Sequence, residues 1–189
     1  TDITRDASLG WVEGEHVIKT LTLAELQTYD VGRMHADTPH AAIYKHQKPV
    51  DGTHIPTLRA VIREMKATAD YSVGFQIEIK TDPTLPHLSA APDVMAIALD
   101  AVIREEGVSA RTKVQAYDWR ALFLLQQLNP EIETAYLTDI DHEKILRHIS
   151  SAVAGQWTGG YLLKDYYDSI PQMIKALGGT WWDVEDIEL

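Results

Sequence analysis

Residues 74–83 decide how this chain is interpreted, and they read Gly74-Phe75-Gln76-Ile77-Glu78-Ile79-Lys80-Thr81-Asp82-Pro83. Apolar and polar side chains alternate along this stretch. Successive side chains of a strand point to opposite faces of a sheet, so the alternation predicts a β-strand, roughly over residues 72–80. One face carries Phe75, Ile77 and Ile79, and the other carries Gln76, Glu78 and Lys80.

Glu78 and Lys80 are the candidate functional residues of this strand. In a β/α barrel the apolar face packs on the outer helices, and the active site lies at the carboxyl end of the strands, nearest to Lys80. Burying a carboxylate and an ammonium costs several kcal/mol per ion unless each is well paired. This cost suggests a function, in which Glu78 holds a divalent cation and Lys80 holds a phosphate oxygen. A half-exposed antiparallel strand with both charges in water fits the same alternation.

Strand-like and helix-like stretches alternate through the rest of the chain. Further strands are expected over residues 113–117, 133–138 and 180–184. Helices are expected to begin near Pro56, Pro92, Asp118, Asp141 and Ser169, and the last four to end near Gly107, Leu128, Val153 and Gly178. Helical spacing predicts a buried stripe of Leu58, Val61, Ile62 and Met65 in the first helix, and of Val94, Ile97, Ala98, Ala101 and Val102 in the second.

This order of elements predicts an α/β domain with a parallel sheet. A doubly wound sheet and part of a (β/α)8 barrel are both compatible with the pattern. No glycine-rich phosphate loop of a nucleotide-binding type occurs in the sequence, which disfavours the doubly wound arrangement.

Composition narrows the possible functions. The chain has 189 residues and a net charge of −11, which argues against general nucleic-acid binding. No cysteine is present, so disulfides, zinc-thiolate sites and a cysteine nucleophile are excluded. No run of apolar residues is long enough for a transmembrane helix, and no signal peptide is visible. The chain opens on Thr1 without an initiator methionine and stops at Leu189 in a continuing segment, so we expect part of a longer protein. The compartment stays open between cytoplasmic and periplasmic or secreted, as does the oligomeric state.

The first part of the chain is more polar than the rest and has a less regular pattern of expected elements. Residues 1–54 are polar and broken, with one short helix that Thr22 and Glu25 open as a capping box. Residues 31–54 are expected to form one long loop. Four histidines, His35, His40, His46 and His54, lie in that loop. Their spacing fits no standard zinc pattern, so surface positions are the simpler interpretation.

Several other residues are weighed against simpler roles. Asp118, in Asp118-Trp119-Arg120, is expected to cap a helix rather than to act in catalysis. The acidic pairs Glu105-Glu106 and Glu185-Asp186 are expected at solvated ends of elements. Arg5 could reach a phosphate or lie on the surface. One tryptophan of Trp181-Trp182 is expected to pack under a helix, because the two point to opposite faces.

Taken in order, several short pieces resemble the glycerophosphodiester phosphodiesterase family. They are Asp2-Ile3-Thr4-Arg5-Asp6, Leu21-Thr22-Leu23-Ala24-Glu25-Leu26, Tyr29-Asp30-Val31-Gly32, Ile55-Pro56-Thr57-Leu58, Ile77-Glu78-Ile79-Lys80, Val114-Gln115-Ala116-Tyr117-Asp118-Trp119-Arg120 and Thr180-Trp181-Trp182. Together they extend over essentially the whole chain.

The resemblance implies a TIM (β/α)8 barrel of phosphodiesterase type, present here as about strands three to six. Residues 1–54 would be an insertion after the second barrel strand, and residues 55–189 the central part of the barrel. Glu78 matches a metal-binding glutamate and Lys80 a lysine near the substrate phosphate. Gln115 and Trp181 match positions close to the site.

The departures from the family pattern are also informative. The His-Arg-Gly motif of the first strand, the Glu-Asn-Thr and Glu-x-Asp pieces with further metal ligands, and the second histidine in a His-Asp context are absent. No catalytic residue is therefore assigned, because none of the eight histidines sits in a matching motif. By this resemblance the first two and last two barrel strands are lacking.

The resemblance implies a hydrolase that converts a glycerophosphodiester into glycerol 3-phosphate and an alcohol, using Ca²⁺ or Mg²⁺, and that acts in lipid and glycerol metabolism. The 189-residue chain by itself is expected to be inactive. Two alternatives remain open, a non-catalytic binding relative with the same barrel and a sugar-phosphate aldolase or isomerase in which Lys80 forms a Schiff base or holds phosphate.

Overall fold

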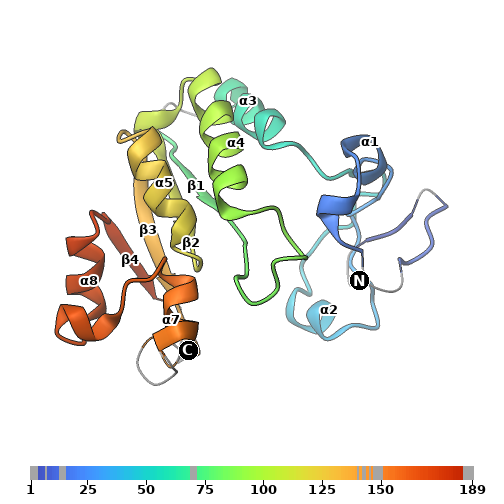
Figure 1. The fold of residues 1–189 in the computed structure, drawn as a ribbon. Helices are drawn as coiled ribbons and strands as arrows, with labels where there is room; N and C mark the ends of the chain where they lie inside the picture. Colours follow the sequence, from blue (N-terminus) through green and yellow to red (C-terminus); the bar gives the residue numbers. More distant parts are fainter. Residues whose placement is uncertain are drawn as a thin grey trace. The chain divides into compact units, whose positions relative to one another are not determined.

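The computed structural model describes residues 4–6, 8–12, 16–68, 72–139, 141, 144, 146 and 151–184 (Figure 1). The chain divides into two compact units, residues 1–61 and 62–189. Of the expectations above, those that concern Asp2, Ile3, His142, His148, Glu185 and Asp186 lie outside the described residues.

The larger unit is built on a four-stranded parallel sheet. The strands are β1 (Phe75–Glu78), β2 (Thr112–Ala116), β3 (Glu133–Thr138) and β4 (Trp181–Val184), and they lie in the order β1-β2-β3-β4. Each strand pairs in parallel with the one that follows it in the sequence. This order confirms the α/β class and the parallel sheet that the alternating pattern predicts, since parallel neighbours need a crossover connection.

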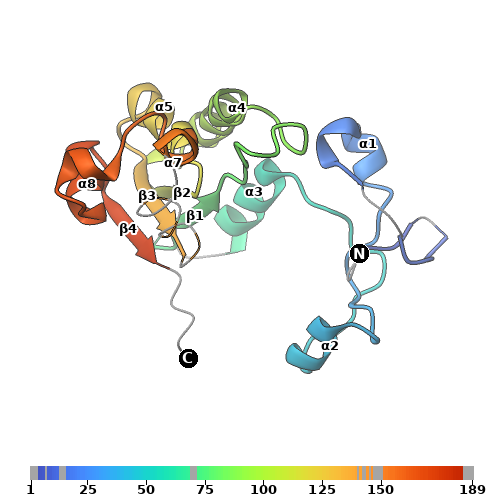
Figure 2. The ribbon, with the colours of Figure 1, turned by 60° about the horizontal axis from the view of Figure 1, so that its bottom comes forward.

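Helix α3 (Leu58–Thr68) precedes β1 and crosses the boundary between the units. Helices also connect the strands: α4 (Pro92–Glu105) joins β1 to β2, α5 (Arg120–Leu128) joins β2 to β3, and α7 (Ser151–Trp157) and α8 (Ile170–Ala176) lie between β3 and β4. Figures 1 and 2 show α4, α5 and α8 on the same side of the sheet. Helix α5 contacts both β2 and β3, and α8 contacts β4.

The core lies between this face of the sheet and its helices. Val114 and Ala116 of β2 and Tyr136 of β3 are fully buried there. The ring of Tyr136 meets that of Trp119 edge to face, with 5.0 Å between the ring centroids. Burial raises the pKa of Tyr136 to about 12, because the phenolate would lose its water. Apolar burial of this kind is the main stabilising contribution to the unit.

Helix α4 buries a different stripe from the one expected. Its buried residues are Ala96, Leu99, Asp100 and Ile103, whereas Val94 and Ile97 are exposed. Asp100 is the reason that the buried stripe is hard to recognise. Its carboxylate accepts hydrogen bonds from Arg104 Nε at 2.8 Å and from Asn129 Nδ2 at 2.8 Å, which satisfy the charge inside the core.

Two further local expectations need correction. Helix α3 begins at Leu58 rather than at Pro56, and of its expected buried stripe Ile62 is fully buried whereas Val61 is exposed. Glu106 is not solvated, because it is buried and pairs with Arg63 at 2.9 Å, while Lys66 Nζ donates to its carbonyl oxygen. The end of α4 is thereby tied to α3.

The described part of the smaller unit contains a 3-10 helix (Ile18–Thr20) and the short α-helices α1 (Leu23–Leu26) and α2 (Pro39–Ile43). The capping box expected at the start of α1 is confirmed: the Glu25 amide donates to Thr22 Oγ1 and the Thr22 amide donates to the Glu25 carboxylate. Helix α2 interrupts the loop expected over residues 31–54. Thr38 caps it and Pro39 occupies its first turn, where a missing N–H costs nothing.

Charged groups hold the smaller unit together. The buried Arg5 guanidinium contacts the carboxylates of Asp30 at 2.5 Å and Asp51 at 2.6 Å. Arg33 closes the network with two bonds of 2.8 Å to Asp51. Arg5 is therefore a buried cross-link in the described structure, which removes the surface alternative considered for it.

A close backbone approach also occurs in this unit. Gly32 lies against the Val50 carbonyl so closely that a Cβ would stand 1.9 Å from its oxygen.

The close approach of Gly179 to the core supports a stability prediction. A Cβ at this position would stand 2.4 Å from Tyr136 Cε2 and 2.6 Å from Ile174 Cγ2. We expect Gly179→Ala to destabilise the larger unit by about 1–3 kcal/mol through overpacking, measured by thermal and urea unfolding. Gly155→Ala is the control, because its Cβ would have no neighbour closer than 3.5 Å. Equal stability of the two variants would contradict the packing argument.

The charge network supports a prediction about acid titration. Hydrogen bonding and charge from Arg33, with a further contribution from Arg5, lower the pKa of Asp51 to about 2. Because the folded pKa is depressed, the stabilisation is present above the unfolded value and is lost as the pH falls towards 2. We expect Arg33→Gln to raise the pKa of Asp51 towards its ordinary value, followed by the carboxyl ¹³C shift. Arg63→Gln is the control, because Arg63 pairs with Glu106 and not with Asp51. If the pKa of Asp51 were unchanged in Arg33→Gln, Arg33 would not be the cause of its depression.

Candidate active site

The face of the sheet opposite to α4, α5 and α8 carries polar side chains in register. The parallel pairing sets Gln76 beside Lys113, Glu78 beside Gln115, and Lys113 beside Glu133. The neighbouring positions in each strand face the helices, because side chains alternate. Gln115 therefore lies next to Glu78, as the alternation along both strands predicts.

The sheet curves around this polar face. In a flat sheet, strands three places apart would be separated by about 14 Å. Nevertheless, the Gln76 side chain on β1 hydrogen-bonds that of Gln115 on β2, and its Nε2 also comes within 3.5 Å of Asp183 Oδ2 on β4. Side chains converge in this way on the concave side of a barrel wall.

Glu78 and Lys80 lie together at the carboxyl end of β1. Lys80 Nζ is 3.6 Å from Glu78 Oε1, and 81% of the Lys80 side chain is exposed against 25% for Glu78. The expectation from the sequence that this ion pair is fully buried is therefore wrong. Both side chains reach solvent, and both line a hollow of about 440 Å³, within the usual range of ligand sites.

A second hollow adjoins this one and shares Glu78, Lys80 and Tyr117 with it. The first is lined by Gln76, Glu78, Lys80, Gln115, Tyr117, Leu137, Asp183 and Val184. The second has a volume of about 320 Å³ and adds Ile79, Thr81, Asp82, Leu88, Ser89 and Trp157 to the shared Glu78, Lys80 and Tyr117. Tyr117 and Asp183 were missed in the sequence, although each follows a named position by two residues on the same strand face.

Trp181 turns towards the other end of the strands. Its indole Nε1 donates to Glu133 Oε2 at 2.7 Å, and Lys113 Nζ lies 4.0 Å from the centre of its ring. Glu133 and Lys113 line a pocket of about 360 Å³ at the amino ends of β1 and β2. Trp181 is thus on the same face as Glu78, and its polar contacts are made at the amino end.

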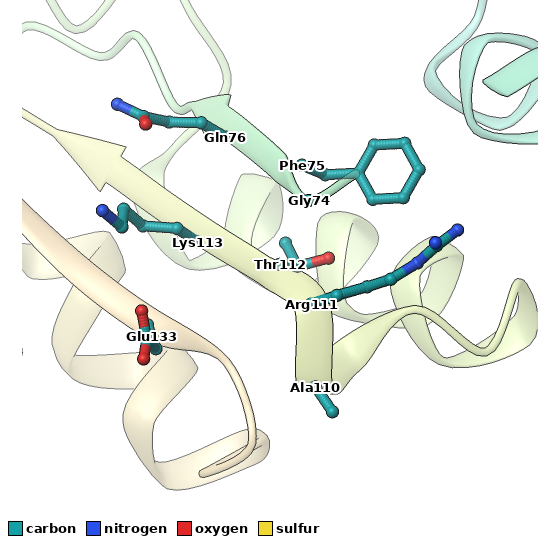
Figure 3. Close-up of a pocket in the computed structure, with 8 residues that line it drawn as sticks. All are labelled: Gly74, Phe75, Gln76, Ala110, Arg111, Thr112, Lys113 and Glu133. Carbon is teal, nitrogen blue, oxygen red and sulfur yellow. The ribbon is translucent and has the colours of Figure 1, made fainter. Parts of the chain in front are cut away.

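Figure 3 shows the pocket at this amino end. Gln76 and Lys113 extend to one side, whereas Phe75 and Arg111 extend to the other, where the guanidinium carbon lies 5.1 Å from the centre of the Phe75 ring. In barrel enzymes the amino ends of the strands contribute to stability and the carboxyl ends to catalysis. The hollow at Glu78 and Lys80 is therefore the better candidate for an active site.

Trp182 faces the opposite way from Trp181. It is half-buried, and its Nε1 donates to Thr138 Oγ1 at 2.9 Å, on the face covered by helices. The opposite orientations of the two tryptophans confirm what strand alternation predicts.

Asp118 is not the N-cap of α5, because Trp119 occupies that position. The Asp118 carboxylate is fully buried and accepts hydrogen bonds from Arg120 Nε at 2.8 Å, Arg120 Nη2 at 2.7 Å and Thr81 Oγ1 at 2.8 Å. Hydrogen bonding to this carboxylate raises the pKa of Arg120. Asp118 thus joins the segments that follow β1 and β2.

Glu78 and Asp183 bring carboxylates, and Gln76 and Gln115 bring amide oxygens, to the hollow on this face of the sheet. Within the described ranges, no three His, Asp or Glu residues are grouped closely enough to enclose an ion. Glu78 offers a partly exposed carboxylate, which fits one oxygen ligand of a hard cation. Among the helices that the structure describes, none is long and apolar enough to cross a membrane.

Comparison with protein families identifies the family of the chain. The model of the "Glycerophosphoryl diester phosphodiesterase family" matches residues 3–178. The chain belongs to this family. Its members fold as TIM barrels, and the parallel β/α arrangement described above is consistent with part of such a barrel. No curated protein matches the chain.

A solved structure supports the fold. A protein of Silicibacter pomeroyi DSS-3, provisionally named a glycerophosphoryl diester phosphodiesterase, superposes with a TM-score of 0.78 at 24% identity. The alignment covers 97% of this chain and 56% of that protein, so the chain spans little more than half of its relative's length. A glycerophosphodiester phosphodiesterase of Parabacteroides distasonis ATCC 8503 aligns over 85% of this chain and 66% of its own, at 16% identity and a TM-score of 0.41, too low to bear on the fold.

Proposed function

We propose that the full-length protein hydrolyses glycerophosphodiesters to glycerol 3-phosphate and an alcohol. The observation that carries this proposal is the pair Glu78 and Lys80 at the carboxyl end of a curved parallel sheet, in a chain that belongs to a phosphodiesterase family. The carboxyl ends of barrel strands are where this fold places its chemistry.

Glu78 and Lys80 have complementary roles in this proposal. Glu78 supplies one carboxylate ligand, and Lys80 directs its ammonium to a phosphate oxygen. A bound Ca²⁺ or Mg²⁺ would supply Lewis-acid stabilisation of charge that develops at phosphorus. When the substrate enters, Lys80 exchanges its contact with Glu78 for one with the phosphate. Both contacts lie near solvent, so this exchange costs little.

Gln115 and Tyr117 are the further residues of β2 and its end that line the proposed site. Gln115 presents an amide next to Glu78, in register across the two strands. Such an amide can donate to a sugar-like hydroxyl or to a phosphate oxygen. Trp181, which contacts Glu133 and Lys113, is assigned a supporting role on the same sheet face, nearer the amino ends of the strands.

A non-catalytic binding relative is the second candidate. Hydrolysis needs groups that move protons to and from the attacking and leaving oxygens. The residues that precede Thr1 in the full-length protein distinguish the two candidates: a His-Arg-Gly strand there would favour hydrolysis, and its absence from the full-length protein would favour binding without turnover. Membership of a phosphodiesterase family gives the aldolase alternative no support.

The role of Glu78 can be tested by substitution. In the full-length protein, we expect Glu78→Ala to lower metal-dependent hydrolysis of glycerophosphocholine by at least about a hundredfold, because a metal ligand is lost. The thermal unfolding midpoint should stay close to that of the wild type, since the side chain is partly exposed. Titration calorimetry with Ca²⁺ and with Mg²⁺ would measure the loss of affinity. Glu131→Ala, an exposed residue before β3, is the control. Unchanged turnover and metal affinity in Glu78→Ala would refute the ligand role.

The proton-transfer argument predicts the behaviour of the 189-residue chain alone. We expect no detectable release of glycerol 3-phosphate from glycerophosphocholine by purified residues 1–189, because the histidine motifs of the family are absent from them. A coupled assay for glycerol 3-phosphate, run beside the full-length protein, would measure this. Turnover by residues 1–189 would show that other groups carry the proton transfers.

A further inference from the structure

A side-chain contact joins the carboxyl ends of β1 and β2. Thr81 directly follows Lys80, and its hydroxyl donates to Asp118 Oδ2 at 2.8 Å. Asp118 lies 37 residues further along the chain, in the turn that leads from β2 into α5. The contact therefore fixes the first turn of one loop to the neighbouring strand end.

Lys80 stands between two such attachments. On one side, the Ile79 amide donates to the Gln115 carbonyl at 2.9 Å, which extends the pairing of β1 with β2 past Glu78. On the other side is the bond from Thr81 to Asp118. The Lys80 side chain itself is 81% exposed and packs little. Its backbone attachments therefore determine which positions its ammonium can reach.

Asp118 is itself held firmly. Its carboxylate is fully buried, and the guanidinium of Arg120 contacts both of its oxygens, Nε to Oδ1 and Nη2 to Oδ2. Bidentate pairing of this kind is strong and directional, and it neutralises a charge that would be costly to bury alone. Oδ2 therefore accepts two hydrogen bonds, one from Arg120 Nη2 and one from the Thr81 hydroxyl, as a carboxylate oxygen with two lone pairs can. Asp118 is in this way a structural acceptor.

We propose that Asp118 and Thr81 are positioning residues that place Lys80 for its contact with the substrate phosphate. This inference rests on the proposed function. A displacement of about 1 Å at a substrate contact can cost two orders of magnitude in rate. Lys80 holds the phosphate before and during reaction, so a loosened Lys80 raises KM more than it lowers kcat.

The test uses Thr81→Val in the full-length protein, because valine keeps the shape of threonine and removes the donor. Loss of one hydrogen bond of ordinary strength corresponds to a change of roughly 2- to 15-fold. We expect kcat/KM for glycerophosphocholine to fall by that factor, mainly through KM, and Thr81→Ser to restore it. Thr134→Val is the matched control, since this buried threonine binds Gln126 at 3.1 Å near the other end of the sheet.

A double-mutant cycle separates positioning from general stability. If Thr81 acts through Lys80, then Thr81→Val should have no further effect on kcat/KM once Lys80 is replaced by methionine. If Thr81→Val lowered kcat/KM by the same factor in the Lys80→Met background as in the wild type, the inference would be overturned. Hydrogen exchange of the segment after β1 gives a second readout, and should quicken in Thr81→Val but not in Thr134→Val.

The outcomes also distinguish this inference from the proposed function. A wild-type protein without hydrolysis would refute the proposed function. An active wild type with Thr81→Val kinetics equal to those of Thr134→Val would refute the positioning role and leave the proposed function standing. Loss of activity in Thr81→Val that Thr81→Ser does not restore would also overturn it, because the hydroxyl would not be the cause.

Discussion

Parallel pairing in register is the constraint on which the rest of the larger unit depends. It brings the carboxyl ends of all four strands to one edge of the sheet, and the two-residue alternation assigns every side chain to a face. Helices α4, α5 and α8 bury one face in an apolar core. The other face can then carry Gln76, Glu78, Gln115 and Asp183, because the core does not need them to be apolar. The alternation of side chains along the same four strands thus places the apolar core on one face of the sheet and the candidate site on the other.

The sequence was most informative where one local pattern decides the structure. Alternation along residues 74–80 was enough to assign the faces of β1, and the opposite orientations of Trp181 and Trp182 followed from the same rule. The pattern misled in α4, where two stripes compete. The truly buried stripe contains Asp100, whose charge is satisfied by Asn129, a residue 29 positions away. A partner so far along the chain leaves no trace in helical periodicity.

The candidate site shows the same limit. Glu78 and Lys80 could be singled out from a single strand, and Gln115 from its neighbour. The role of Asp118 could not, because its acceptor function depends on Thr81 at the end of another strand. The smaller unit was harder still, since buried charges take the place of an apolar core there. The spacing of Arg5, Asp30 and Asp51 along the chain does not indicate that their side chains are in contact.

The exposure of Glu78 and Lys80 changes the physical reason for attributing function to them. A buried pair would suggest function through its desolvation cost, because a hydrophobic pair would stabilise the fold as well. The pair reaches solvent instead, and an exposed ion pair is worth about 0–1 kcal/mol. So weak a contact does little for stability and yields readily to a stronger partner. Rigidity must then come from the backbone on either side, which the Ile79 amide and the Thr81 hydroxyl provide. A site that combines loosely paired charges with a fixed backbone is suited to exchanging its internal contacts for those of a ligand.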